Sequence, residues 1–123
     1  MGKGHRDLKV FQRAYSLALQ IFEVSKTFPK EERFALTDQL RRSSRSVAAN
    51  IAEGYRRGRH PHMFKLRLVD ADAETTETQV WLDFARDCGY LSRDRAEELL
   101  KGYEEIDRML GGILADQSRF GPA

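Results

Sequence analysis

The chain has 123 residues and a formal net charge of +2, with 41% hydrophobic and 33% charged residues, which is typical of one soluble globular domain. Its single cysteine, Cys88, excludes an intrachain disulfide and fits a reducing compartment. No apolar run approaches the roughly 20 residues of a membrane-spanning helix and no signal peptide is expected, so we expect one cytoplasmic domain over residues 1–123.

Hydrophobic periodicity predicts a first helix over residues 7–27, with Asp7 as its N-cap. Two apolar stripes run along this helix, which is more than a surface helix needs. The first stripe comprises Leu8, Phe11, Tyr15, Ala18 and Phe22. The second comprises Val10, Ala14, Leu17, Ile21 and Val24. Pro29 then interrupts helical structure.

A second helix is predicted over residues 36–58, with Thr37 as a candidate N-cap, although the helix can also begin a turn earlier. Gly58 suits the left-handed position that follows many helices. The core-facing positions follow a four-three spacing. They are Leu36, Leu40, Ser44, Val47, Ile51 and Tyr55.

The second helix also carries an unusual polar set near its end. Asn50 lies near the apolar seam, where an asparagine often fixes the register of a bundle, so we expect this structural role first and a ligand or partner contact second. Glu53, one residue before Gly54, can reach Arg56 or Arg57 at helical spacing. We treat Asn50, Glu53 and Gly54 as a structural motif or interface.

A third helix is predicted over residues 62–88 and a fourth over residues 92–116, with Gly89 closing the third and Ser92 capping the fourth. The third keeps its spacing at Phe64, Leu68, Ala71, Thr75, Thr78, Leu82 and Ala85. A second stripe on nearly its opposite side comprises Leu66, Val69, Ala73, Val80 and Phe84. The seam of the fourth is Ala96, Leu99, Tyr103, Ile106, Leu110 and Ile113.

Four helices with short connections predict an all-α fold, an antiparallel up-down-up-down four-helix bundle. The wide apolar arcs leave surface that one bundle does not bury. We therefore expect a homo-oligomer, held by the second stripes of the first and third helices.

Charge is unevenly distributed along the chain. Residues 41–69 carry eight basic groups and one acidic group, whereas residues 70–123 carry six basic and thirteen acidic groups. This pattern suggests a polyanion-binding surface or self-association between unlike patches. Pairing of these charges with neighbours on a solvated helix face is the alternative.

No pattern in the sequence predicts a catalytic or metal site, so we expect no enzyme activity, no metal and no cofactor. The histidines lack the Glu-x-x-His spacing of di-metal bundles, and His60 and His62 are expected to be exposed in a turn. Glu74 and Glu77, one helical turn apart, are expected to pair with basic neighbours. Cys88 is expected to be a buried structural cysteine.

Three motifs carry a resemblance to a known family: Gln39-Leu-Arg-Arg42, Ser46-Val-Ala-Ala-Asn-Ile-Ala-Glu-Gly54 and Gly89-Tyr-Leu91. They resemble the signature of the bacterial four-helix-bundle protein family, also known as the 23S rRNA intervening-sequence proteins. The resemblance covers roughly residues 5–115. Where that family commonly has Ala-x-Gly-Ser-x-x-Glu in its third helix, this chain has Ala73 and Glu74 in place of Gly-Ser. This departure adds bulk and charge where helices approach.

The resemblance implies a ring-shaped homopentamer of bundles around a central channel. It also implies a relation to the accessory variability determinant of diversity-generating retroelements, a basic pentamer that binds nucleic acid and a reverse transcriptase. We therefore expect a non-enzymatic oligomeric adaptor that binds RNA or DNA electrostatically with little sequence readout. The alternative is a protein-binding scaffold whose basic and acidic faces pair between subunits or with a protein partner. The candidate phosphate contacts are Arg41, Arg42, Arg45, Arg56, Arg57 and Arg59.

Overall fold

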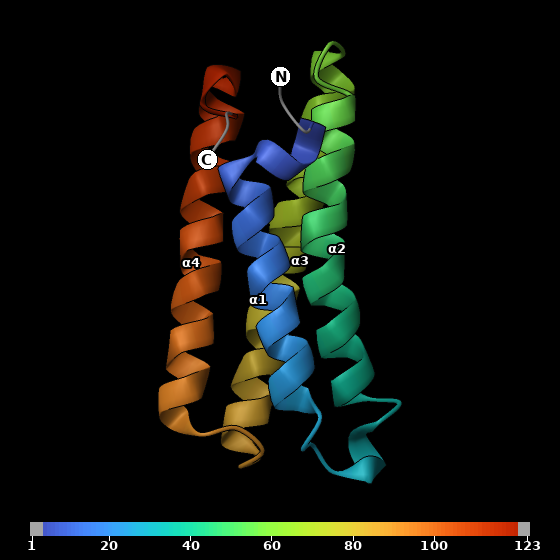
Figure 1. Cartoon of the computed structure of the whole chain (residues 1–123), viewed down its shortest axis with the longest axis vertical. Helices are drawn as coiled ribbons and strands as arrows, with labels where there is room; N and C mark the ends of the chain where they lie inside the picture. Colours follow the sequence, from blue (N-terminus) through green and yellow to red (C-terminus); the bar gives the residue numbers. More distant parts are fainter. Residues whose placement is uncertain (1–3, 121–123) are drawn as a thin grey trace.

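The computed structural model describes residues 4–120, which form four long helices joined by short connections. The long helices are α1 (Lys9–Ser25), α2 (Leu36–Arg56), α3 (Pro61–Asp87) and α4 (Arg93–Ala115). The short 3-10 helices are η1 (Gly4–Asp7), η2 (Lys30–Glu32) and η3 (Gln117–Arg119). Successive long helices run in opposite directions (Figure 1), and no strand occurs within the described range. The predicted four-helix bundle is confirmed for these residues.

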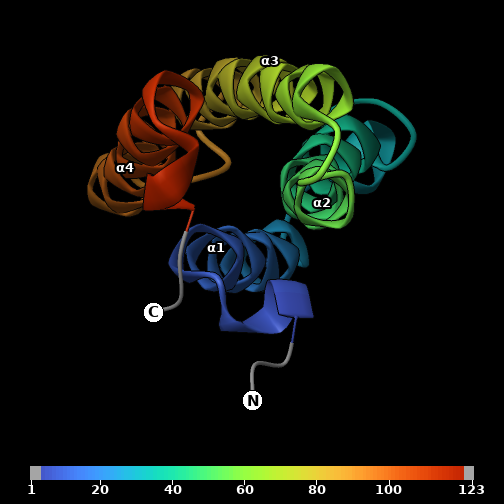
Figure 2. The same cartoon turned by 90° about the horizontal axis from the view of Figure 1, so that it is seen from above.

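The four helices surround one core (Figure 2), in which α1 and α3 each pack against α2 and α4. The seams predicted for the third and fourth helices are buried at every position, because four-three spacing returns each residue to the same helix face. In α2 the predicted seam is buried from Leu36 to Ile51, whereas Tyr55 at its end is 39% exposed. The periodicity of the sequence therefore locates the core.

The stripe of α1 that faces the core is the second one, which includes Val10, Ala14 and Ile21. Of the first stripe only Leu8, which precedes the helix, is buried, and within the helix Tyr15 is 53% exposed. The prediction that the second stripe of this helix holds an oligomer together is therefore wrong. A glycine explains the choice: a Cβ on Gly102 of α4 would lie 2.5 Å from Leu17 Cδ2. The second stripe packs closely on α4 because Gly102 has no side chain.

The second stripe of α3 is exposed, as the wide apolar arc of this helix indicated. Its four large residues remain between 42% and 52% accessible in the single chain. They are Leu66, Val69, Val80 and Phe84.

Two predicted helix ends are confirmed and three are wrong. Ser92 caps α4 by accepting a hydrogen bond from the Arg95 backbone N–H at 3.1 Å, and Gly89 has a left-handed φ of +79°. Asp7 lies within η1, and Leu8 is the residue that precedes α1. Burial of Leu8 explains this shift, since its side chain anchors the chain to the core before the helix begins.

The helix α2 begins at Leu36, as predicted, but its two capping residues differ from the prediction. The buried Thr37 lies inside the first turn instead of capping it. Gly58 has no positive φ, because its N–H bonds Tyr55 O at 3.1 Å in a turn that leads directly into Pro61. Cys88 is exposed, contrary to prediction, since it caps α3 beyond the last core residue of that helix.

Candidate nucleic-acid interface

The six predicted phosphate contacts fall into two groups along α2 and the turn that follows it. Arg41, Arg42 and Arg45 lie in its first half, and the other three lie at its end. A rise of 1.5 Å per residue puts roughly 15–20 Å between the groups. The sequence indicated one basic run, whereas the structure separates two basic regions with different surroundings.

Arg41 is engaged in packing α2 on α1. Its Nε donates to Ser25 Oγ at 2.8 Å, and its guanidinium lies 4.8 Å from the centre of the Phe22 ring. The guanidinium of Arg45 lies 5.8 Å from the same ring. Cations over aromatic faces are stabilised by the ring quadrupole. Part of the predicted phosphate-binding set therefore holds two helices together.

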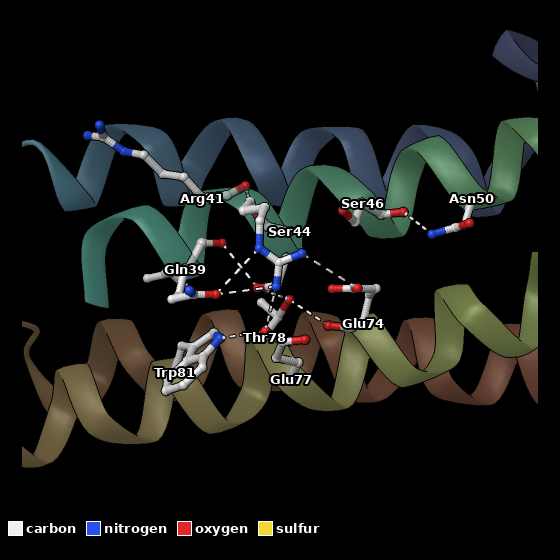
Figure 3. Close-up of polar contacts among 12 residues, drawn as sticks. Gln39, Arg41, Ser44, Ser46, Asn50, Glu74, Glu77, Thr78 and Trp81 are labelled. Carbon is white, nitrogen blue, oxygen red and sulfur yellow. Dashed lines mark hydrogen bonds and ion pairs between the residues drawn. The ribbon is translucent and has the colours of Figure 1, made fainter. Parts of the chain in front are cut away.

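Arg42 is paired with acidic groups of α3. Its Nη2 donates to Glu77 Oε1 at 2.8 Å, and its Nη1 lies 3.8 Å from Glu74 Oε1. Trp81 Nε1 donates to the same Glu77 oxygen at 3.2 Å (Figure 3). The predicted pairing of Glu74 and Glu77 with a basic neighbour is confirmed. Burial, and then the neighbouring Glu77 carboxylate, raise the pKa of Glu74. Of the two residues that differ from the family pattern, Glu74 thus adds charge between α2 and α3, whereas Ala73 is exposed.

The predicted structural motif has a different basis from the one expected. Asn50 Nδ2 donates to Ser46 O of its own helix at 3.0 Å, so this bond fixes no register between helices (Figure 3). Glu53 pairs with Arg67 of α3 at 3.3 Å instead of Arg56 or Arg57. Gly54 is buried, and a Cβ placed on it would lie 3.1 Å from Leu68 Cδ2. Gly54 therefore allows α2 to approach α3 closely.

The second arginine group forms what we call the basic corner, Arg56, Arg57 and Arg59, at the junction of α2 and α3. All three side chains are exposed, and none forms an ion pair among the described residues. His60 and His62 are both exposed, as predicted, although His62 lies in the first turn of α3 and not in the connecting turn. In the first group, by contrast, Arg42 is paired with carboxylates of α3, and Arg41 and Arg45 lie over the Phe22 ring.

A hollow of about 650 Å³ opens beside the basic corner. Its lining brings together α2, the turn and the C-terminal segment: Tyr55, Arg56, Gly58, Arg59, His60, Gln117 and Phe120. Gln117 Nε2 donates to Gly58 O at 2.9 Å, and the Phe120 ring centre lies 6.2 Å from that of Tyr55. Gln117 and Phe120 were not predicted as site residues, because no periodicity indicates where a segment beyond the last helix folds back.

Two exposed apolar surfaces lie apart from the basic corner. One is a groove of about 600 Å³ between α1 and α2, which we call the α1–α2 groove. It is lined by His5, Phe11, Tyr15, Ala18, Leu19, Phe22, Arg45, Ala48, Ala49 and Ala52. The other, which we call the α3 stripe, comprises Leu66, Val69, Ala73, Val80 and Phe84. Four alanines help to line the groove, whereas four larger side chains are exposed along the stripe.

A carboxyl group between α3 and α4 makes stability depend on pH. Asp107 Oδ2 accepts a hydrogen bond from Gln79 Nε2 at 3.2 Å. Burial, the Asp72 carboxyl group and the Glu104 charge raise the pKa of Asp107. A raised folded-state pKa means that the folded chain binds more protons than the unfolded chain. The stability from this group is therefore lost as pH rises through the folded pKa.

Replacing Asp107 by asparagine removes that dependence. We expect the difference in unfolding free energy between Asp107→Asn and the original chain to increase from pH 4 to pH 7, because an amide does not ionise and so has no pH-dependent burial penalty. Urea denaturation at several pH values measures the difference. Glu31→Gln, at an exposed carboxylate of η2, is the control. A constant difference across this range would contradict the role of Asp107.

Residues 4–120 contain neither a candidate metal cluster nor a candidate membrane-spanning helix. No group of three or more His, Cys, Asp or Glu side chains is placed to hold a metal ion. In the same range, every helix is too short or too polar to span a membrane.

The chain is similar to a known protein family and to a solved structure. The sequence model of a family described as "23S rRNA-intervening sequence protein" matches residues 6–112. A crystal structure of a protein of unknown function from the S23 ribosomal protein family of Bacteroides thetaiotaomicron superposes with a TM-score of 0.78 at 27% sequence identity. The match covers 86% of this chain and 95% of that one. No curated protein matches the sequence.

Proposed function

The chain belongs to the 23S rRNA-intervening sequence protein family, and from this membership and its basic corner we propose that it is a non-enzymatic oligomeric adaptor in the cytoplasm that binds RNA or DNA with little sequence readout. The observation that carries the proposal is the basic corner, where Arg56, Arg57 and Arg59 are exposed without ion pairs in the described part of the chain. Arginine presents a planar fork of donors that matches phosphate oxygens.

The basic corner is better suited to phosphate contact than the first arginine group. Binding through Arg42 would have to break its contacts with Glu74 and Glu77, and binding through Arg41 would compete with its hydrogen bond to Ser25. The basic corner requires no such exchange. Contacts to phosphate carry no base information and release counterions, which accounts for the expected lack of sequence readout.

We also propose that copies of the chain assemble into a ring, with the α3 stripe of one copy lying in the α1–α2 groove of the next. Both surfaces are apolar, and one is a groove whereas the other is an exposed helix face. An interface between two unlike surfaces is head-to-tail. Such an interface closes into a ring when the rotation between subunits allows it. The family resemblance implies that this ring has five subunits. A ring repeats the basic corner once per subunit.

Charge reversal at the basic corner tests the proposed nucleic-acid binding. For Arg56→Glu combined with Arg57→Glu, we expect affinity for labelled RNA and DNA to fall at least ~10-fold near 0.1 M salt, with the salt slope reduced by about one unit per arginine removed. Fluorescence anisotropy measures both quantities. Lys30→Glu combined with Arg93→Glu is the matched control, since it makes the same charge change at exposed positions near the other end of the bundle.

Equal losses in the corner variant and the control would show that only net charge matters and would contradict the assignment. Binding of neither RNA nor DNA by an intact oligomer would favour the alternative, a protein-binding scaffold. In that case a protein partner, for which the resemblance suggests a reverse transcriptase, becomes the leading candidate.

A further inference from the structure

The hollow beside the basic corner combines aromatic, cationic and amide groups in one place. Its volume of about 650 Å³ lies within the range of small-molecule sites. Tyr55 is 39% exposed, and Arg56 and Arg59 line the same hollow. A second hollow in this region lacks the combination, because it is lined by arginines, Glu53 and Met63 and has no aromatic residue. The first hollow therefore offers an aromatic surface beside positive charge.

The wall of this hollow is fixed by contacts of the C-terminal segment. The Phe120 ring packs against Phe64 of the core, with ring centres 5.5 Å apart, and against Tyr55 at 6.2 Å. The Gln117 side chain holds the turn through its hydrogen bond to Gly58 O. Because the Phe120 ring is anchored on the core, the aromatic surface is in place before any ligand arrives.

We infer that this hollow receives one unpaired nucleotide of a single-stranded nucleic acid. Its phosphate lies against Arg56 and Arg59, and its base stacks on the aromatic pair Tyr55 and Phe120. A base inside a duplex is already stacked and paired, so a duplex contacts the basic corner only through its phosphates. Every base has a π-face, so stacking adds strand preference without sequence preference. The inference rests on the proposed function and specifies the class of nucleic acid.

Two variants of Phe120 test the inference. Phe120→Ala removes the ring, and Phe120→Leu removes the π-face but keeps apolar volume against Phe64. The probes are a single-stranded oligonucleotide containing 2-aminopurine and a duplex of the same length. We expect both variants to lower single-strand affinity roughly ten-fold, the scale of base–aromatic stacking, and to reduce the 2-aminopurine quenching that the original chain is expected to cause. Duplex affinity is expected to stay unchanged.

Phe34→Ala is the matched control, because Phe34 is an aromatic side chain that is 83% exposed near the opposite end of α2. It is expected to leave both affinities unchanged. Equal loss of single-strand and duplex binding in the Phe120 variants, or unaltered quenching in Phe120→Leu, would overturn the inference. Those outcomes leave the proposed function standing if Arg56→Glu with Arg57→Glu still weakens binding as expected above. Intact binding in the arginine variant would instead contradict the proposed function itself.

Discussion

Replacing Gly54 by leucine is expected to destabilise the bundle by about 3 kcal/mol, the upper range for inserting atoms into a packed interior. Gly54 is buried where α2 approaches α3, and even a Cβ there would lie 3.1 Å from Leu68 Cδ2 and 3.5 Å from Arg67 Cβ. The three further carbon atoms of leucine have no space without separation of the two helices. Chemical denaturation followed by circular dichroism measures the loss.

Gly111→Leu is the matched control for this substitution. Gly111 also lies within a helix, but nothing lies within 4 Å of a Cβ built on it. Leucine favours helix over glycine by roughly 0.5–1 kcal/mol, so this variant is expected to be slightly more stable. If both variants changed stability by the same amount, helix propensity would account for Gly54 and the close approach would carry no weight.

Placing acidic residues on the α3 stripe is expected to dissociate the proposed ring into single chains. In Val69→Asp combined with Val80→Asp, two residues that are 52% and 42% exposed gain charges that the α1–α2 groove would have to bury. Burial of an unpaired charge is costly enough to abolish association. Light scattering measures the mass, and circular dichroism checks that each chain stays helical. Phe34→Asp, at an exposed aromatic outside both surfaces, is the control and is expected to keep the oligomer.

Mixing two defective chains tests the head-to-tail geometry. Leu19→Asp impairs the α1–α2 groove and leaves the α3 stripe intact, whereas Val69→Asp with Val80→Asp does the reverse. Each variant alone is expected to be a single chain. Together they are expected to form a dimer of one copy of each, since one intact groove meets one intact stripe. A dimer formed by the Leu19→Asp variant alone would show that like surfaces pair and would contradict the ring.

The fold follows from the sequence because its signals are periodic and local. Leu68 and Leu82 recur on one face of a helix, so the pattern identifies them as core without knowledge of the neighbours. The choice between the two stripes of α1 was not accessible in this way, because both are apolar. It depends on Gly102, about 85 residues further along the chain, whose missing side chain lets Leu17 approach α4.

The candidate site was predicted in composition but not in arrangement. The sequence indicated the arginines, yet it did not show that Arg42 pairs with Glu77 on α3 while Arg57 remains without an ion pair in the described structure. Such pairing depends on tertiary neighbours. Phe120 was missed for the same reason, since its place beside Tyr55 depends on how the segment after α4 returns to the α2–α3 junction.

The salt dependence of binding tests the central claim most directly. The original chain, with its oligomeric mass fixed by light scattering, is titrated by fluorescence anisotropy against labelled single-stranded RNA and DNA at several salt concentrations. Three phosphate contacts from one basic corner predict a slope of about −2 to −3 in log K against log salt for each subunit in contact. A slope near zero, or no binding by the intact oligomer, would contradict the account.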